Sequence, residues 1–447
     1  MVYHTISVDI FLWVVVLIVL IRGLTTLPSL FKSFSWLKSF EIDIKPIQPH
    51  KHNFVYILIP VLREQKRIIP TLKYFVKHFG RNKFQIVVIT TQKEFKKPIF
   101  RSSTFSIVRN FILKNKLEQI VTYINYPSKT GGMAHQLNFA LSKIKNRNAF
   151  IAVYNADSRP HPKTFIFFHE ELERNPNGKA FQQSAIFLKN YQEIDRNKNL
   201  AKSLFLRASA ILQTRWTLAH EIPRLLRQST YYPKFLQKFV NAHVVGHGLI
   251  IKINVLREIG GFPTSSLTED LFLGYLLRSK GINIYPIPVL EFADAPASVL
   301  GLWNQKYVWF WGPMKYFSYF KFVLKNREKL AVNDMFVPFI LTIQGLISAI
   351  AWIVSGPLIL VALLSFIISS NYFLIFCAYF SVLIYGPLQY ALVYQRFVNS
   401  KILQTILIGI ASIPAIIFHS IPPIFSIINE IKHSFVGKEI YKPKTDD

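Results

Sequence analysis

The stretch IAVYNADSRP, residues 151–160, is the first indication of the fold. Four residues with the pattern of a buried strand lead directly into Asn155, Ala156 and Asp157, and a Ser-Arg-Pro turn follows. An apolar strand that ends in an acidic residue places that residue at the carboxyl edge of a sheet, where open α/β sheets bind their ligands. Asp157 is therefore a candidate for chemistry; the alternative is a turn that it caps through its own backbone.

The residues before this stretch predict an α/β domain. Residues 54–60 and 85–90 are short β-branched runs, and a helical pattern over 68–79 lies between them. Alternating strand and helix patterns imply a mostly parallel sheet. Residues 129–141 add a Gly-Gly turn that leads into a helix. Two glycines would let a ligand approach the backbone closely, and a tight turn alone would also explain them.

The residues after this stretch add two further motifs. A Gly-His-Gly sequence lies between apolar segments within residues 241–253, and SLTED follows at 266–270. Its Ser and Glu have capping-box spacing, which predicts a helix over 271–277 with Asp270 in the first turn. An acid at that position also complements the helix dipole, so its chemistry is not decided by position alone.

The composition points to a membrane protein. The 447 residues include 53 Lys and Arg against 24 Asp and Glu, a net charge of +29. Such a basic chain suits nucleic acid, anionic lipid or a phosphorylated substrate, but 51% of the residues are hydrophobic and long apolar runs are present. These runs favour the bilayer, and we expect no nucleic-acid partner. The single cysteine, Cys377, excludes an intrachain disulfide.

The N-terminal apolar run predicts a membrane anchor. Residues 10–21 are continuously apolar, and their positive charge follows the run, whereas a signal peptide carries it before. We expect an anchor at 1–23 with its N-terminus outside and the chain after it in the cytoplasm, as in a plasma-membrane protein. Residues 24–52 are expected to be an interfacial or linker segment.

The C-terminal part is expected to return to the membrane. Apolar runs within 331–430 predict three to four further segments, with a break at Gly356-Pro357. Basic residues on both sides of the last run conflict with a single crossing, and its prolines are compatible with a re-entrant pair of half-helices. Residues 431–447 are expected to form a basic cytoplasmic tail.

Residues 298–330 are unusually aromatic. Trp303, Tyr307 and Trp311 recur at helical spacing, which fits an amphipathic helix at the bilayer interface with this stripe toward lipid. The alternative is a core helix, and the lysines distributed through the segment argue against it.

Together these stretches resemble membrane-anchored family 2 glycosyltransferases with a GT-A catalytic domain, whose relatives include cellulose or hyaluronan synthase-like and ceramide glucosyltransferase-like enzymes. The resemblance implies a Rossmann-like, mostly parallel α/β domain at 53–297, inserted between one N-terminal and several C-terminal transmembrane helices. It rests on five stretches in the family's order: Pro60 with Arg63, Glu64 and Gln65; Gly131 to Ala134 with Leu137 and Asn138; Asn155 to Asp157; Thr268 to Asp270; and Gln305 to Trp309.

The resemblance implies an inverting transferase that moves a sugar from a nucleotide-sugar donor to a growing polysaccharide or a lipid-linked acceptor. Asp157 would bind Mg²⁺ or Mn²⁺, which neutralises the leaving diphosphate. Asp270, with Glu269 beside it, would be the base for the acceptor hydroxyl. The expected donor contacts are Pro60, Glu64, Thr90, Asn155, Asp157, Gln305 and Trp309, and the expected acceptor contacts are His247 and Thr268.

Three departures from the family pattern keep alternatives open. Asn155 brings no charge, Thr90 and its neighbours stand where many members carry a carboxylate pair, and Val308 replaces an arginine. Lys306, Arg63 and Lys129 are the candidate replacements for that cation. The alternatives are transfer of one sugar to a lipid and a membrane scaffold or transporter that has lost catalysis.

Overall fold

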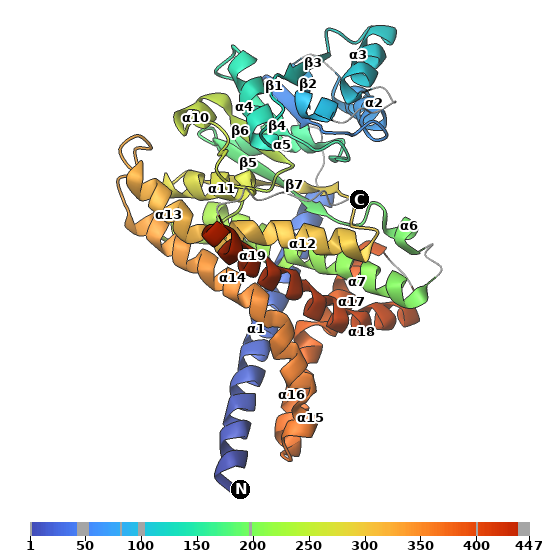
Figure 1. The fold of residues 1–447 in the computed structure, drawn as a ribbon, viewed down its shortest axis with the longest axis vertical. Helices are drawn as coiled ribbons and strands as arrows, with labels where there is room; N and C mark the ends of the chain where they lie inside the picture. Colours follow the sequence, from blue (N-terminus) through green and yellow to red (C-terminus); the bar gives the residue numbers. More distant parts are fainter. Residues whose placement is uncertain are drawn as a thin grey trace.

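The computed structural model describes residues 2–42, 53–80, 83–96, 103–195, 199–398 and 401–436. Figure 1 shows a sheet domain above a stalk of long helices. The strands are β1 Val55–Pro60, β2 Phe84–Thr91, β3 Val121–Tyr126, β4 Phe150–Val153, β5 Ala180–Ile186, β6 Leu249–Lys252 and β7 Ile284–Phe292. The helices of the sheet domain are α2 Ile68–Phe79, η1 Gln92–Lys96, α3 Thr104–Lys114, α4 Met133–Lys143, α5 Thr164–Arg174, α6 Tyr191–Asp195, α7 Leu200–Trp216, η2 Thr217–Glu221, α8 Ile222–Leu226, η3 Arg227–Tyr231, α9 Lys234–Gln237, α10 Ile253–Glu258 and α11 Glu269–Ser279. The remaining helices are α1 Val2–Ile42, α12 Val299–Met314, α13 Tyr316–Lys325, α14 Phe336–Leu363, α15 Ser365–Ile368, α16 Tyr372–Tyr385, α17 Pro387–Val398, α18 Ile402–His419 and α19 Ile421–Val436.

The seven strands form one sheet in the order β3-β2-β1-β4-β6-β5-β7, and all of them fall within residues 53–297. Neighbouring strands are parallel except for β6, which is antiparallel to both β4 and β5. In the parallel part Leu58 lies opposite Val153, and Pro60 lies opposite Ile89. The strands β1, β2 and β4 therefore end at one edge, and the predicted mostly parallel sheet is confirmed.

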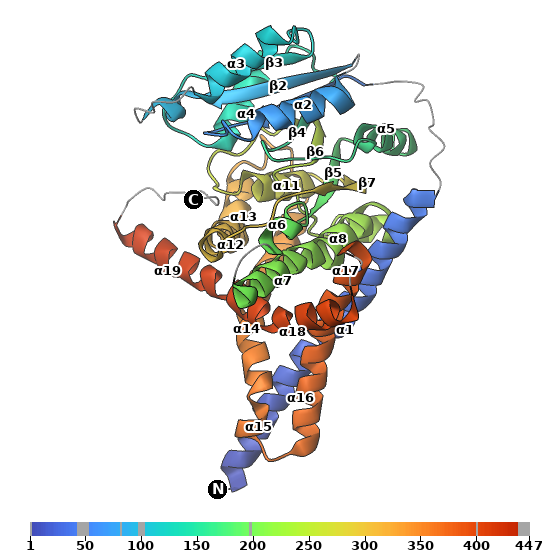
Figure 2. The same ribbon diagram turned by 90° about the vertical axis from the view of Figure 1, so that its right-hand side faces the viewer.

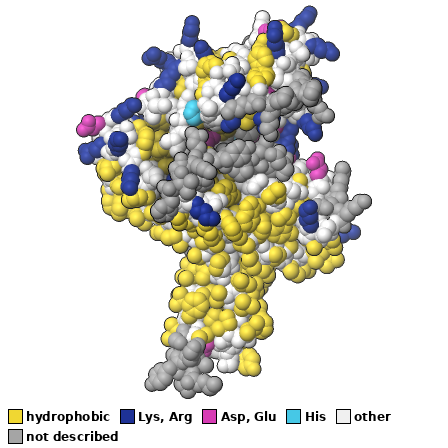
Figure 3. Space-filling model, in the orientation of Figure 1, with side chains coloured by type: hydrophobic (Ala, Val, Ile, Leu, Met, Phe, Trp, Pro, Cys, Tyr) yellow, Lys and Arg dark blue, Asp and Glu magenta, His cyan; other side chains and the backbone are white. Residues whose placement is uncertain are grey.

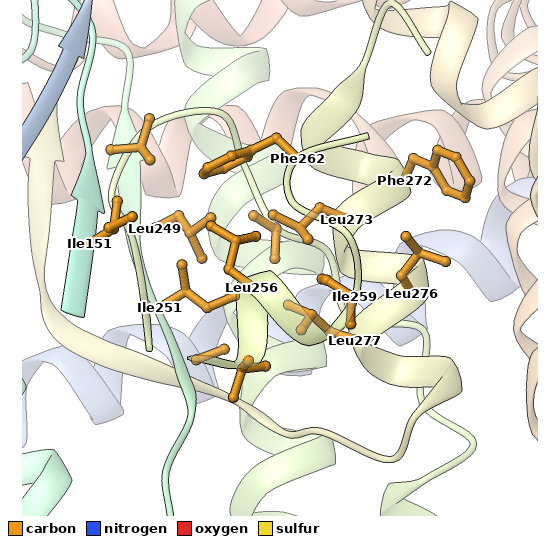
Figure 4. Packing of buried hydrophobic residues seen from close by; sticks show 14 of the residues in the cluster. Ile151, Leu249, Ile251, Leu256, Ile259, Phe262, Phe272, Leu273, Leu276 and Leu277 are labelled. Carbon is orange, nitrogen blue, oxygen red and sulfur yellow. The ribbon is translucent and has the colours of Figure 1, made fainter. Parts of the chain in front are cut away.

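Both faces of the sheet are buried. In β1, Ile57 and Ile59 pack with α2, α3 and α5, whereas Leu58 faces α4, α10 and α11. Alternate residues of a strand point to opposite faces, so a strand covered on both sides reads as a continuous apolar run. Figure 4 shows the second layer, in which Leu273 and Leu277 of α11 approach the β6 strand. This packing fixes the start of α11 beside the strand ends.

The N-terminal helix is longer than expected. Residues 24–42, expected as a separate interfacial or linker segment, instead continue α1 without a break. The Ser33 hydroxyl donates to the carbonyl of Leu218 at 2.6 Å, and the Phe40 ring meets Phe167 edge-on at 6.1 Å. Tertiary contacts with the sheet domain thus extend the helix past the apolar anchor. Residues 43–52 lie outside the described part of the chain.

Four segments among the described residues are long and apolar enough to cross a membrane: 8–40, 336–363, 372–398 and 402–432. In Figures 1 and 2, α1, α14 and α16 run side by side as the stalk, and the N-terminus lies at its far end from the sheet. Figure 3 shows that hydrophobic side chains cover the stalk. The protein therefore associates with a membrane through this part.

The last candidate segment does not run along the stalk. In both views α18 lies across the head of the stalk, and α19 continues from it beside α12. The segment is nevertheless long and apolar enough to cross a membrane, so its path through the bilayer stays a prediction. The predicted division into two helices is observed as α18 and α19, which meet at residue 420. Residues 437–447 of the expected tail lie outside the described part of the chain.

The predicted break at Gly356-Pro357 is wrong, because α14 continues through both residues. A side chain at Gly356 would stand 2.1 Å from the Ser420 hydroxyl and 2.9 Å from the Ile417 backbone. The glycine is therefore explained by the close approach of α14 to α18. Proline inside a helix removes one backbone hydrogen bond and is tolerated in membrane helices.

Candidate active site at the carboxyl edge of the sheet

Two of the five motifs, the Gly-Gly turn with its helix and the acidic motif, line one pocket together with the end of β4 and the Gly-His-Gly segment. This small pocket is lined by Val153 at the end of β4, Met133 at the start of α4, Gly246, and Glu269 with Asp270 at the start of α11. The side-chain amide of Asn138 in α4 also bonds both backbone groups of Phe262, at 2.8 Å each. The motif with Gly131 and Asn138 therefore holds the loop that precedes the acidic motif.

The acidic pair stands at the first turn of α11. Glu269 is buried, and the Asp270 carboxylate accepts the N–H of Leu271 at 2.8 Å. A side chain at Gly246 would lie 3.2 Å from that carboxylate, so a glycine here lets the backbone pass close to it. Asp270 thus lies on the pocket wall beside the Gly-His-Gly segment.

The helix α11 begins two residues earlier than predicted, and its cap is different. Thr268, not Ser266, is the N-cap residue, and its side chain makes no capping hydrogen bond. The Ser266 hydroxyl instead accepts the Thr268 N–H at 3.2 Å and lies 3.0 Å from the Tyr319 hydroxyl. A side chain at Gly312 of α12 would lie 2.6 Å from the Thr268 hydroxyl. The predicted capping box is therefore wrong, because α12 and α13 pack onto this turn.

Asp157 lies in a tight turn directly after β4. The turn is closed by hydrogen bonds from Ser158 N–H to the Asn155 carbonyl, at 3.2 Å, and from Asn155 N–H to the Ser158 hydroxyl, at 3.0 Å. Lys189 donates to the Asp157 carbonyl at 2.9 Å and to the Asp294 carboxylate at 3.1 Å. Burial, reinforced by Asp294 and Glu291, raises the pKa of Asp157.

His247 lies among the same cluster of acidic side chains as Asp157. Its Nδ1 lies 2.9 Å from the carboxylate of Glu291, which is 1% exposed. Burial alone would lower the pKa of His247, but Glu291, followed by Asp157 and Glu221, raises it to about 9. The ring is therefore positively charged at neutral pH and balances part of the negative charge at this edge.

The sequence analysis did not identify two acidic residues of this cluster, Glu291 and Glu221. Glu291 sits near the end of β7, inside an otherwise apolar run. Glu221 accepts a hydrogen bond from Ser184 at 2.6 Å, and burial raises its pKa to about 7. An acid within an apolar strand was the available signal for Glu291. The sequence holds no comparable signal for Glu221, which reaches the site from the helical segment after α7.

The glycines of the Gly-His-Gly segment have separate causes. Gly248 has φ of +73°, and a side chain there would stand 2.4 Å from the Gln183 carbonyl. Its N–H donates to the Val153 carbonyl at 2.8 Å, which ties the segment to the end of β4. Only glycine adopts this conformation at little cost, so the turn that presents His247 depends on it.

The expected donor residues at β1 and β2 are only partly brought to the site. Pro60 is buried at the end of β1, and the Glu64 N–H donates to the Thr104 hydroxyl at 3.2 Å. Thr90 is fully buried, and its hydroxyl donates to the Asn125 side chain at 3.0 Å. Thr90 is therefore buried inside the sheet and is not accessible to a ligand.

Arg63 is better placed than Thr90. It follows β1 with φ of +58°, and its buried Nε has no hydrogen-bond partner among the described residues. Of the three proposed replacements for the cation missing at Val308, Arg63 thus lies at the strand edge with an unused donor. Lys306 points elsewhere, into a cavity between helices.

The two expected donor contacts on α12, Gln305 and Trp309, both touch the sheet domain. The Gln305 side chain accepts a hydrogen bond from Gln213 of α7 at 2.7 Å, and the Trp309 ring lies 5.8 Å from Phe187, which follows β5. Trp309 is 37% exposed and so remains accessible. Gln305, in contrast, is buried against α7.

The aromatic stripe of α12 does not face lipid, contrary to expectation. Trp303 packs on Phe425 with ring centroids 5.1 Å apart, and Asn429 donates to the Tyr307 hydroxyl at 3.1 Å. Trp311 is 2% exposed. The reason is α19, which returns along α12 and covers the stripe. Helical periodicity indicates that a face is apolar and does not identify what covers it.

The site fits a metal ion that is bound together with a phosphate ligand. Among the described residues, no group of three or more His, Cys, Asp and Glu side chains is arranged to hold an ion. Mg²⁺ is commonly held by one or two carboxylates and by substrate phosphates, so a complete protein cage is not required. The like charges of Asp294 and Glu291 disfavour the ionised form of Asp157, and a cation would relieve that repulsion.

Comparisons with solved structures give three weak similarities. A mannosyltransferase from Pyrobaculum calidifontis, solved with GDP-Man and Mn²⁺, is 15% identical, with 96% of this chain and 100% of that chain covered and a TM-score of 0.48. Residues 1–349 of S. aureus TarS are 11% identical, with 87% and 93% covered and a TM-score of 0.38. Glucosyl-3-phosphoglycerate synthase from Mycobacterium tuberculosis, solved with Mn²⁺, UDP and phosphoglyceric acid, is 12% identical, with 54% and 70% covered and a TM-score of 0.33.

The family comparison is decisive. The comparison with curated protein sequences gives no match. The model of glycosyl transferase family group 2, in contrast, matches residues 150–394, more than half of the chain. The match includes the end of β4, the Gly-His-Gly segment, the acidic motif of α11 and the stalk helices α14 and α16. The chain therefore belongs to glycosyl transferase family group 2, as a membrane-associated glycosyltransferase with a GT-A-like α/β domain.

Proposed function

We propose that the protein is an inverting glycosyltransferase that takes a sugar from a nucleotide-sugar donor and extends a polysaccharide or lipid-linked acceptor at the cytoplasmic face of a membrane. The observation that carries the proposal is the pocket shared by Asp270, Glu269 and the end of β4. It places one carboxylate at a helix start opposite the strand that delivers Asp157.

Asp270 has the features of the acceptor base. Direct displacement with inversion needs one base that takes the proton of the acceptor hydroxyl as the new bond forms. Asp270 lies on the pocket wall, and the Gly246 backbone passes beside it without a side chain that would block access. Glu269 is buried and lines the same pocket beside it.

Asp157 and Asn155 are the residues that would hold a Mg²⁺ or Mn²⁺ ion on the donor side. When bound, such an ion neutralises negative charge on the diphosphate leaving group. The charged His247 ring, held by Glu291, interacts electrostatically with Asp157 and adds positive charge to the donor side. Asn155 brings no charge, so we expect weaker metal binding than with two acids.

The decisive experiment is transfer by the full chain in lipid nanodiscs. The purified protein is incubated with a panel of radiolabelled nucleotide sugars and Mg²⁺ or Mn²⁺, with an Asp270→Asn variant as the control. We expect label in a larger product with at least one donor. Absence of both transfer and donor hydrolysis across the panel would contradict the proposal.

A second candidate is transfer of one sugar to a membrane lipid. It is favoured by the position of α12, which lies between the sheet domain and α19 at the head of the stalk, close to where a lipid headgroup would sit. Product size separates the two functions. A ladder of products indicates a polysaccharide synthase, and one labelled glycolipid indicates the second candidate.

A third candidate, a scaffold that has lost catalysis, is favoured by the burial of Thr90 and Val308, which leaves neither at the surface of the site. It requires that Asp270→Asn leave the cellular phenotype unchanged. Loss of the phenotype in that variant, at a normal level of folded protein, would exclude the scaffold.

A further inference from the structure

An exposed apolar face lies to one side of the stalk. In Figure 1, α13 and the first turns of α14 form a hairpin that projects sideways from the head of the stalk. Four large apolar side chains of this hairpin are exposed to a similar extent, and we call them the corner face. They are Phe317 at 54%, Leu324 at 51%, Phe336 at 57% and Phe339 at 45%. Contiguous apolar surface of this kind marks a site of contact with a membrane or another protein.

The opposite side of α13 fixes the orientation of the corner face. On that side Tyr319 is 3% exposed and Val323 is fully buried. The Tyr319 ring stacks on Phe272 of α11 with centroids 4.3 Å apart, and the Phe320 ring lies 6.1 Å from Phe339 of α14. The helix α13 is therefore held between α11 and α14, and its remaining side stays on the outside.

The corner face is continuous with a segment that is long enough to cross the membrane. Beyond Phe339, the side chains of Ile343, Ile347 and Ile350 are 40%, 60% and 59% exposed, and they follow one another at helical spacing along α14. This stripe lies within residues 336–363, one of the candidate membrane segments. Figure 3 shows hydrophobic side chains that extend from this corner into the stalk. A bilayer around the stalk would therefore also reach the corner face.

Basic side chains border the corner face. Lys321, Lys325, Arg327 and Lys329 are all exposed, and the same stretch contains one exposed acid, Glu328. Within the described ranges, none of the four basic residues takes part in an ion pair. An anionic membrane surface attracts basic residues that flank a membrane segment in this way. The charge of the hairpin thus complements anionic lipid.

Lys321 shows how the apolar and basic groups are combined. It follows Phe317 by one helical turn, and its Nζ lies 4.6 Å from the centroid of the Phe317 ring. Its aliphatic stem therefore covers apolar surface while its ammonium group stays accessible, as in lysines at membrane interfaces. Lys325 follows one turn later. Lipid chains would meet the apolar part of this surface, and lipid phosphates would meet its ammonium groups.

We propose that the corner face lies in the interface of the bilayer, where the basic residues of α13 and of the loop after it bind anionic lipid headgroups. The occupant is the lipid of the leaflet that surrounds the head of the stalk. A second copy of this chain would also cover apolar residues, but a twofold contact would bring the same unpaired basic residues together. The proposal concerns membrane contact alone and does not depend on sugar transfer.

The test is the quenching of a fluorescent label by brominated lipids. Cys377→Ala removes the single cysteine, and Leu324→Cys in that background carries bimane on the corner face. The full chain is reconstituted in bilayers of phosphatidylcholine and phosphatidylglycerol, in which one or the other lipid carries bromine on its acyl chains. We expect both lipids to quench the label. Phosphatidylglycerol should have an apparent affinity for this site that is at least about fivefold higher, the factor that one basic residue supplies at an anionic membrane.

Two further label positions are matched controls. Leu113→Cys lies on α3, at the far end of the sheet domain from the stalk, where Leu113 is 49% exposed and, like Leu324, precedes a lysine. Neither lipid should quench this label. Phe376→Cys replaces a 65% exposed residue of α16 in the stalk, within residues 372–395, which contain no Lys or Arg. Both lipids should quench this second label equally.

Charge variants assign the lipid preference to the hairpin. Lys321→Gln combined with Lys325→Gln and Lys329→Gln should leave the corner-face label quenched but should remove most of the preference for phosphatidylglycerol. Lys114→Gln combined with Lys116→Gln on α3 is the control and should keep that preference. All five lysines are exposed, so the substituted proteins should fold like the native chain.

The contrary results are distinct. A corner-face label that is not quenched, while the Phe376→Cys label is, would overturn the membrane contact. Equal quenching by the two lipids, or a preference that survives the lysine substitutions, would overturn the binding of anionic headgroups. Pyrene in place of bimane reports a second copy of the chain. Excimer emission that rises with the ratio of protein to lipid would assign the corner face to a contact between chains and so contradict the proposal.

Discussion

The sheet edge and the head of the stalk each bury a basic side chain, and the pKa values of the two shift in opposite directions. The His247 side chain is 12% exposed and its pKa is raised to about 9, whereas Lys306 is 2% exposed and its pKa is lowered. Burial disfavours both charges, so the difference lies in the neighbours. His247 has the Glu291 carboxylate at 2.9 Å, and Lys306 has no acid in its cavity.

The contrast shows that neighbouring carboxylates decide whether a buried basic side chain stays charged. At the sheet edge, Glu291, Asp157 and Glu221 come from three different parts of the chain and together hold one imidazolium. At the stalk, no acidic side chain is among the residues that surround Lys306, so burial alone acts on the amine and lowers its pKa. Four predictions test the contrast, from the largest expected effect to the smallest.

Removing the acid at the sheet edge should have the largest effect on stability. Glu291→Ala leaves His247 buried without its partner, and breaking a buried pair in this way typically costs about 3–5 kcal/mol. Chemical denaturation in detergent measures the loss. Glu258→Ala on α10 is the control, because that glutamate is exposed, and it should change stability little. Similar losses in both variants would show that the ion pair between Glu291 and His247 contributes no more to stability than an exposed glutamate does.

Replacing His247 and replacing Lys306 should change the free energy of unfolding in opposite directions. The folded pKa of His247, about 9, lies above its unfolded value of about 6.5, so its stabilisation is complete below pH 6.5 and is lost as pH rises through 9. The shift corresponds to a contribution on the order of 3 kcal/mol. The pKa of Lys306 is lowered, so its penalty is largest at low pH and fades as pH rises toward its usual pKa.

Unfolding of the two variants at pH 6.5 and pH 9.5, in detergent free of phosphate lipids, measures this difference. His247→Gln should be less stable than the native chain, and its deficit should shrink at the higher pH. Lys306→Met should be more stable, and its gain should shrink at the higher pH. Stability differences of the same sign in both variants, or differences independent of pH, would contradict this prediction.

Catalysis should depend on the sheet edge. Asp270→Asn keeps the size and hydrogen bonding of the side chain but removes its basicity, so transfer should fall by roughly 10² or more. Binding of the nucleotide-sugar donor should survive. Rates and donor affinity are measured with the donor identified in the radiolabel panel, and Asp334→Asn, at an exposed position near α14, is the control. Full transfer by Asp270→Asn would remove this residue from the role of base.

Donor binding should depend on Asp157 only when metal is present. Asp157→Ala removes one charged ligand, and donor affinity measured with Mn²⁺ should fall by at least about tenfold, or 1.4 kcal/mol. With a chelator in place of Mn²⁺, native protein and variant should bind the donor similarly. An unchanged affinity with Mn²⁺ would place the metal elsewhere, and an equal loss with the chelator would point to a structural defect.

Local patterns predicted much of the sheet domain. The helix over 68–79 has the bounds expected from its periodicity. The strand β1 differs from the predicted run by one residue at its start, and β2 by one residue at each end. These elements are covered on both faces or have one clear apolar stripe, so the pattern of side chains follows the pattern of burial. The meeting of the Gly-Gly, Gly-His-Gly and acidic motifs at one pocket, in contrast, is seen only in the structure.

By itself, the sequence determined the mostly parallel sheet, the membrane helices and the acidic residues at the strand and helix ends, because each depends on neighbours a few positions away. The tertiary structure alone decided which partners they meet. Glu291 is 44 residues from His247, and Asn429 of α19 is 122 residues from Tyr307, whose face had been expected to meet lipid. Periodicity records that a face is buried or a charge is present, whereas the identity of the partner depends on how distant segments pack.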